Sequence, residues 1–155
     1  MSRRPVQLSM HVQYAIPRAG LPAATSIRRW ASVALEQSAE ATVRLVDEHE
    51  GRILNRSYRG RDYATNVLTF AYGLQDGALM GDIVLCAPVV AREATEQCKP
   101  LRLHYAHLVV HGMLHLQGYD HERASEARKM EAKEIAILAQ LGFDNPYEDG
   151  YRSHA

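Results

Sequence analysis

Residues 111–121 read HGMLHLQGYDH and set three histidines in the spacing HxxxHxxGxxH. The apolar, helix-forming residues that lead into this stretch predict a long helix over residues 101–117. His111 and His115 stand four residues apart on that helix, so their Cβ atoms should lie about 5 to 6 Å apart on one face. A single zinc ion can bridge two imidazoles at this separation.

Gly118 explains how His121 can join the other two histidines. Glycine readily adopts the left-handed conformation that ends a helix and turns the chain back. If the helix continued, residue 121 would stand about 600° around the axis from residue 115, roughly on the opposite side. The break brings His121 toward His111 and His115, and we predict that these three residues bind one Zn2+ ion per chain.

Three imidazole ligands leave the fourth position of a tetrahedral zinc ion open, as in catalytic sites and unlike structural ones. A water molecule in that position has its pKa lowered from about 15.7 to about 7, which makes it a nucleophile near neutral pH. The pattern thus predicts a metal-dependent hydrolase that needs His115 for catalysis as well as for metal binding. The same ligands also suit nickel, cobalt or copper.

Other polar residues near the three histidines are weaker candidates for a role in the metal site. Asp120 is a candidate to orient an imidazole by accepting its other N–H, although a role in the turn is an equally good interpretation. His107, one helical turn before His111, is expected to pack as a polar residue and not to bind the ion. Four further histidines are expected to take no part: His11, His49, His104 and His154.

Gly112 argues against a peptidase. Metzincin proteases share the HxxxHxxGxxH spacing, but they carry a glutamate directly after the first histidine, where it acts as the general base. Here that position is Gly112, so the group that deprotonates the water is missing. A phosphodiester makes a different demand, because charge develops on its nonbridging oxygens and a metal ion and a guanidinium can stabilise it.

Arginines that can supply such a guanidinium lie upstream. Arg52, Arg56 and Arg59 follow helical spacing, and Arg61 comes just beyond Gly60. They are candidates to bind phosphate, although a solvated helix face with ordinary surface arginines explains the pattern equally well. Residues 1–62 carry a formal charge of +4 and residues 63–155 one of −4, so any RNA contact is expected on a local patch of the first part.

The chain resembles the YbeY endoribonucleases, a family formerly described as predicted metal-dependent hydrolases. HGMLHLQGYDH agrees with the family signature HGxLHLxGYDH at every fixed position, and the resemblance covers roughly residues 40–148. A second family pattern, NxxYRxxDxxTDVLSFP, is matched by Asn55, Tyr58, Arg59, Asp62, Thr65, Val67, Leu68 and Phe70. It is not matched at Asn66, Thr69 and Ala71, where aspartate, serine and proline are usual.

This resemblance implies a zincin-like fold and cleavage of single-stranded RNA, with roles in 16S ribosomal RNA 3′ end maturation and ribosome quality control. It implies that Arg59 is catalytic, and it makes Arg56, Arg61 and Asn66 candidates to bind substrate. The implied partners are the ribosome, small-subunit protein S11 and the GTPase Era. Two alternatives are a ribosome assembly factor whose zinc is structural and, with less support, a metalloprotease.

Length and composition predict one domain over residues 1–155, with 46% hydrophobic and 23% charged residues. No apolar run approaches the roughly 20 residues of a membrane span, and no signal peptide is recognisable, so a cytoplasmic location is expected. Strands are predicted at residues 6–14, 41–48, 65–72 and 80–86. Helices are predicted at residues 22–38, 50–58, 88–97, 101–117 and 124–141.

These elements favour an α+β fold in which a small mixed four-stranded sheet packs against helices. The metal site is expected on a central helix and the loop that follows it. Residues 144–155 show little periodicity and are predicted to form a poorly ordered tail.

Overall fold

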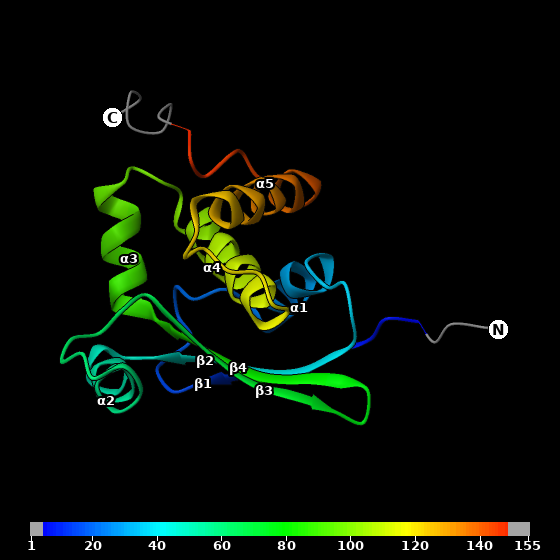
Figure 1. Cartoon of the computed structure of the whole chain (residues 1–155). Helices are drawn as coiled ribbons and strands as arrows, with labels where there is room; N and C mark the ends of the chain where they lie inside the picture. The colour runs from blue at the N-terminus through cyan, green and yellow to red at the C-terminus, as the bar shows by residue number, and fades with distance from the viewer. Residues whose placement is uncertain (1–4, 149–155) are drawn as a thin grey trace.

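The computed structural model describes residues 5–148 and confirms the predicted α+β fold (Figure 1). The strands are β1 (Leu8–Tyr14), β2 (Ala39–Val46), β3 (Val67–Gln75) and β4 (Ala78–Cys86). The helices are α1 (Ala24–Val33), α2 (Glu48–Arg59), α3 (Ala87–Glu96), α4 (Leu101–Leu116) and α5 (Ala124–Gln140). Within the described residues, the elements follow one another in the predicted order. His154 and residues 149–155 of the predicted tail lie outside the described residues.

The sheet is mixed, as predicted, with strand order β1-β2-β4-β3. β1, β2 and β4 run parallel, and β3 lies at one edge antiparallel to β4. Asp76 and Gly77 join β3 to β4 with φ angles of 52° and 81°, which are the positive values that a two-residue type I′ hairpin turn requires. β3 is thus an edge strand with one side unpaired in the sheet, and its first residues form one wall of the site described below.

α4 occupies the centre of the molecule. Figure 1 shows α1, α4 and α5 on one side of the sheet, and α4 contacts both of these helices as well as α3, β3 and β4. Twelve of its 16 residues are buried, as expected for a helix that is apolar on nearly every side. Trp30, Ile83, Tyr105, Met113 and Leu138 belong to the core cluster around it. This burial holds the histidine-bearing helix rigidly above the sheet.

Two glycines allow α4 to approach the sheet closely. A Cβ atom on Gly81 of β4 would lie 2.4 Å from Cδ2 of Leu116 and 2.9 Å from the backbone oxygen of Phe70. A Cβ atom on Gly112 of α4 would lie 2.9 Å from Cδ1 of Ile83. All three distances are shorter than side chains tolerate in a packed core, so a larger residue at either position would force the neighbouring atoms to shift.

The first helix is shorter than predicted. The apolar pattern predicts a helix over residues 22–38, whereas α1 ends at Val33 and β2 begins at Ala39. The side chain of Gln117 explains the difference, because its Nε2 donates to the backbone oxygen of Ala34 at 2.8 Å and its Oε1 accepts from the backbone nitrogen of Glu36 at 2.6 Å. These partners lie far apart in the sequence, so no local pattern reveals them.

α2 packs on the opposite side of the sheet from α4. Its start is capped by Asp47, whose carboxylate accepts from the backbone nitrogen of Glu50 at 2.8 Å, and it ends at Gly60 with φ 68°. Leu54 of α2 contacts a second, smaller apolar cluster that includes Leu68 and Val84. Among residues 5–148, the helices are too short or too polar to span a lipid bilayer.

We predict that Gly81→Ala lowers the free energy of unfolding by about 1 to 3 kcal/mol, because the added methyl group overpacks the contact with α4. Urea denaturation measures the loss. In a Leu116→Ala background the same substitution should cost less, since the side chain it meets at 2.4 Å is then absent. An equal cost in both backgrounds would show that this contact does not limit the approach of α4.

Candidate active site

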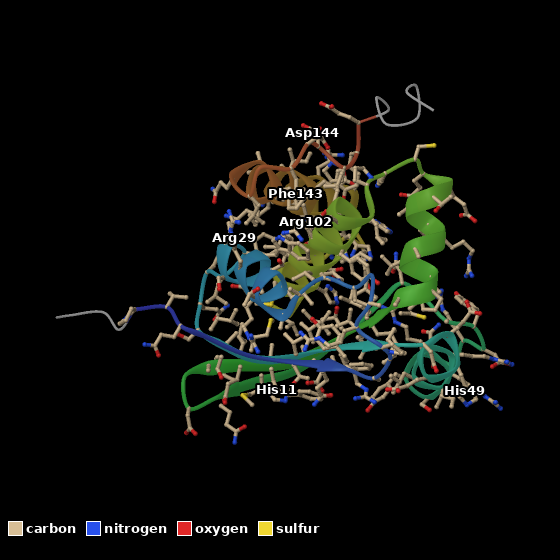
Figure 2. All side chains as sticks on the ribbon, turned by 180° about the vertical axis from the view of Figure 1, so that it is seen from behind. His11, Arg29, His49, Arg102, Phe143 and Asp144 are labelled. Carbon is tan, nitrogen blue, oxygen red and sulfur yellow. The ribbon has the colours of Figure 1, made fainter. Side chains whose placement is uncertain are left out.

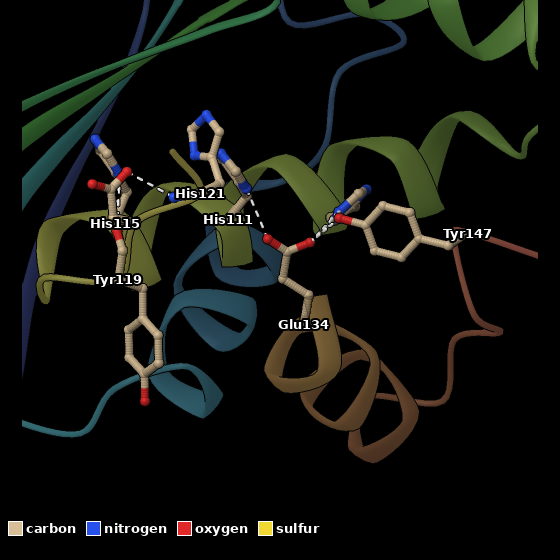
Figure 3. Close-up of polar contacts among 8 residues, drawn as sticks. His111, His115, Tyr119, His121, Glu134 and Tyr147 are labelled. Atoms are coloured by element: carbon tan, nitrogen blue, oxygen red, sulfur yellow. Dashed lines mark hydrogen bonds and ion pairs between the residues drawn. The ribbon is translucent and has the colours of Figure 1, made fainter. Parts of the chain in front are cut away.

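The structure brings His111, His115 and His121 together at the C-terminal end of α4 (Figure 3). Gly118 follows the helix with φ 101°, and the chain then turns so that His121 faces the helix. The ring centroids lie 6.5 Å apart for His111 and His115, 5.6 Å for His111 and His121, and 6.1 Å for His115 and His121. The glycine break thus places the third imidazole beside the other two.

Hydrogen bonds leave one nitrogen of each helical histidine available. Nδ1–H of His111 donates to Oε2 of Glu134 at 2.7 Å, and Nδ1–H of His115 donates to the backbone oxygen of Tyr119 at 3.1 Å. With Nδ1 engaged in this way, Nε2 is the atom that either ring can offer to a ligand. Burial lowers the pKa of His115, which favours the neutral ring that metal binding requires.

The three imidazoles form a suitable donor set for zinc, but they are slightly too far apart. Around one tetrahedral zinc ion with nitrogen ligands, ring centroids would lie about 5 Å apart. Within residues 5–148, no group of three or more His, Cys, Asp or Glu side chains already has the arrangement of a metal site. The widest separation, 6.5 Å, is between His111 and His115, so the side chains of these two helical residues as well as that of His121 would have to rotate to bind one ion.

A cavity of about 170 Å³ lies between the three histidines and the start of β3. Arg59, at the end of α2, lines the same cavity, so the arginine predicted to be catalytic and the predicted metal ligands share one space. The rest of the wall comes from the segment that leads into β3 and from β3 itself, and consists of Thr65, Asn66, Val67 and Thr69.

The neighbouring arginines are placed differently. Arg56 and Arg61 are exposed and are not among the residues that line this cavity, and Nη1 of Arg61 donates to the hydroxyl of Tyr63 at 3.0 Å. Arg52 is paired with Asp62 at 2.7 Å. Arg59 is therefore the arginine of this segment that lies at the cavity, while Arg56 and Arg61 are exposed and do not line it.

Asn66 lines the cavity, but its side chain is held by other groups. Its Nδ2 donates to Oε1 of Glu93 at 2.9 Å, and its Oδ1 accepts from the backbone nitrogen of Val67 at 2.6 Å. Glu93 also accepts from Nε2 of His104 at 2.9 Å, so His104 belongs to a polar cluster behind Asn66 and is not among the residues that line the cavity. Burial lowers the pKa of His104. Asn66 is thus fixed as part of the cavity wall.

Asp120 shapes the turn and contacts no imidazole in the hydrogen bonds of the described residues. Its Oδ1 accepts from the backbone nitrogens of His121 at 2.7 Å and Glu122 at 3.2 Å. This is the local bonding that aspartate commonly makes in turns. Of the two roles open to Asp120, these hydrogen bonds support the one in the turn, while Tyr119 and Glu134 accept from the rings of His115 and His111.

The sequence interpretation missed Glu134. This residue of α5 is 0% exposed, and its carboxylate accepts hydrogen bonds from His107, His111 and Tyr147. Burial alone would raise the pKa of Glu134, but these hydrogen bonds outweigh it and lower the pKa to about 2. A signal was present in the sequence, since residue 134 falls on the apolar face of α5 formed by Met130, Ile137 and Leu138.

His107 packs as a polar residue, as predicted, with Nε2 2.7 Å from Oε1 of Glu134. The hydroxyl of Tyr147 donates to the same oxygen, and its ring lies 5.1 Å from that of His107. Residues 144–148, which belong to the predicted tail, are described by the structure, and Tyr147 makes these contacts. Figure 2 shows His11 and His49 on the far side of the sheet from α4, away from the three histidines.

Comparison with known proteins places the chain among close relatives. The sequence profile described as endoribonuclease YbeY matches residues 23–142. A protein named endoribonuclease YbeY from Stenotrophomonas maltophilia is 55% identical over 95% of this chain and 98% of its own length. A protein of the same name from Aromatoleum aromaticum is 61% identical over 91% of this chain and 93% of its own length.

The fold also has a solved counterpart. The solution structure of TM1509 from Thermotoga maritima superimposes with a TM-score of 0.56 and 22% sequence identity, covering 90% of this chain and 99% of that one. This likeness shows a shared fold. Because the family profile spans most of the chain and the curated relatives match it over nearly their full length, the chain belongs to the endoribonuclease YbeY family.

Proposed function

We propose that this protein is an endoribonuclease that cleaves single-stranded RNA with the help of one zinc ion held by His111, His115 and His121. The observation that carries the proposal is that the three imidazoles and the guanidinium of Arg59 line one cavity. Membership of the endoribonuclease YbeY family supports RNA as the substrate.

The residues of the cavity suit the charge that develops when a phosphodiester is cleaved. A bound zinc ion supplies Lewis acidity at phosphorus and a water of lowered pKa. Arg59 binds the nonbridging oxygens with parallel N–H donors and stabilises their growing negative charge. Glu134 and the backbone oxygen of Tyr119 engage Nδ1 of His111 and His115, so the Nε2 atoms of both rings would be the ones to hold the ion.

The shape of the cavity favours an unpaired strand as the substrate. The cavity is small and lies between α4 and the edge strand β3, so the backbone of the RNA must bend to reach it. Unpaired RNA bends and splays its bases more readily than an A-form duplex. Arg56 and Arg61, which are exposed and close to Arg59 in the sequence, would add positive charge for neighbouring phosphates of either kind of strand.

The cellular role that we propose follows the family resemblance. We place the activity in 16S ribosomal RNA 3′ end maturation and ribosome quality control in the cytoplasm, with the ribosome, protein S11 and the GTPase Era as partners. The competing hypothesis is a ribosome assembly factor whose zinc is structural. This hypothesis predicts that the protein does not cleave free RNA.

Peptide hydrolysis is disfavoured by the position of Gly112. A Cβ atom there would meet Ile83 of the sheet at 2.9 Å. The Cα–Cβ bond of a glutamate at this position would therefore point into the core and away from the cavity. The fold cannot accommodate the general base of metzincin proteases here without a shift of α4 or of Ile83.

We predict that His115→Ala loses bound zinc and RNA cleavage together, because it removes a ligand from the centre of the triad. Metal analysis and cleavage of a short single-stranded RNA, with and without a chelator, measure both. His49→Ala is the matched control, since His49 is exposed on α2, and it should keep metal and activity. Cleavage that persists in the metal-free His115→Ala protein would contradict the metal-dependent mechanism.

Arg59→Glu should keep the fold and the bound metal but lower the rate of RNA cleavage by about 100-fold or more, since one charge-stabilising donor is worth about 10² to 10³ in rate. Arg29→Glu, on the exposed surface of α1, applies the same charge change elsewhere and should cleave normally (Figure 2). Normal cleavage by Arg59→Glu would show that Arg59 is not catalytic.

Gly118→Ala and Gly142→Ala are expected to cost similar stability, about 1 to 2 kcal/mol each, because both replace a glycine with a positive φ. Only Gly118→Ala should weaken zinc binding, since it disturbs the turn that carries His121. Thermal unfolding and zinc titration separate the two effects. Equal zinc affinity in the two variants would mean that the glycine break does not position the third ligand.

A further inference from the structure

Glu134 is a charged group buried at a position that its helix otherwise gives to apolar residues. It is 0% exposed, and both of its oxygens are used: Oε2 accepts from Nδ1–H of His111 at 2.7 Å, and Oε1 accepts from Nε2–H of His107 at 2.7 Å and from the hydroxyl of Tyr147. A buried carboxylate is tolerated only when it is fully paired. If the carboxylate rotated away from any one of these partners, either its negative charge or the N–H or O–H group of that partner would be left without a hydrogen bond.

Tyr147 reaches this carboxylate from the segment that follows α5. Phe143 anchors the start of the segment, with its ring 6.1 Å from that of Trp30 and its backbone nitrogen bonded to the oxygen of Leu138 at 2.8 Å. Asn145 then shapes the turn, because its Oδ1 accepts from the backbone nitrogen of Tyr147 at 2.8 Å. The segment 143–148 is therefore held in the core at one end and on Glu134 at the other.

Figure 3 shows the resulting chain of contacts, which runs from the C-terminal segment through Glu134 to His111. His111 is 26% exposed and borders the cavity, whereas Glu134 is sealed behind it. The orientation of the His111 ring thus depends on a carboxylate whose own orientation is set from the opposite side by His107 and Tyr147.

We infer that Glu134 and Tyr147 are positioning residues of the metal site, and that the segment 143–148 acts as a latch whose docking and zinc binding at His111 stabilise each other. This inference rests on the proposed zinc site. Carboxylates that accept from the second nitrogen of a histidine ligand are known to strengthen metal binding. Coupling of this kind is reciprocal, so zinc must also stabilise the docked latch.

The test compares three substitutions in the full chain with zinc alone as the probe. Tyr147→Phe keeps the ring against His107 and removes only the hydroxyl, whereas Glu134→Gln keeps the shape of the side chain and removes its charge. Tyr72→Phe is the matched control, because the hydroxyl of Tyr72 donates to Oδ2 of Asp82 at 2.8 Å, in a contact separate from the histidines. Zinc dissociation constants come from competition with a chelating indicator.

We expect the dissociation constant for zinc to rise about 10- to 100-fold in Glu134→Gln and about tenfold in Tyr147→Phe, by analogy with other partners of histidine ligands. Tyr72→Phe should bind zinc as the wild type does. Hydrogen exchange gives a second readout: zinc should slow exchange of the backbone amides of residues 143–148 in the wild type and much less in Tyr147→Phe. If Tyr147→Phe only loosened packing, exchange of these amides would be faster to the same extent with and without zinc. The protection that zinc adds would then equal that in the wild type.

Wild-type zinc affinity in both Glu134→Gln and Tyr147→Phe, with undiminished protection of the segment by zinc, would overturn the inference and leave the proposed function intact. Should Glu134→Gln fail to fold, the Tyr147→Phe comparison decides alone. A wild-type protein that binds no zinc would overturn both the latch and the proposed function.

Discussion

The burial of α4 between the sheet and the other helices is the constraint on which the rest of the structure depends. Gly81 and Gly112 let the helix and the sheet approach within contact distances that no larger side chain allows. Because the helix is fixed along its length, its C-terminal turn holds His111 and His115 in a constant relation to β3 and to Arg59. A site built on such an element is more precise than one built on loops alone.

The site combines this rigid part with a short adjustable one. The two helical histidines are oriented by Glu134 and by the backbone of Tyr119, whereas His121 sits exposed on the turn after Gly118. The ring separations of 5.6 to 6.5 Å are slightly wider than zinc requires; the turn can bring His121 closer, whereas the 6.5 Å between His111 and His115 can narrow only by rotation of those two side chains. Metal binding would then order the loop while the helix stays in place.

Local patterns were sufficient to predict the order of the elements and the stretch that carries the three histidines. Helical spacing and a glycine break are properties of neighbouring residues, so the approach of His121 to His111 follows from the sequence alone. The end of α1 did not follow, because Gln117 sets it from a distant part of the chain. The role of Asp120 stayed open for a related reason, since nothing local tells whether a carboxylate bonds a ring or the backbone.

Glu134 and Tyr147 show the same limit more clearly. A glutamate on an apolar helix face indicates a buried partner, but its identity depends on how α5 and the following segment pack on α4. The placement of Arg59 beside the histidines likewise depends on where α2 ends relative to β3, although the family resemblance indicated its role before the fold did.

X-ray absorption at the zinc edge of the zinc-loaded protein tests the central claim most directly. The account predicts three imidazole nitrogens and one oxygen at about 2.0 to 2.1 Å from a single zinc ion. A spectrum with fewer imidazoles or with sulfur in the coordination sphere would contradict it, because His111, His115 and His121 would then not hold the metal together.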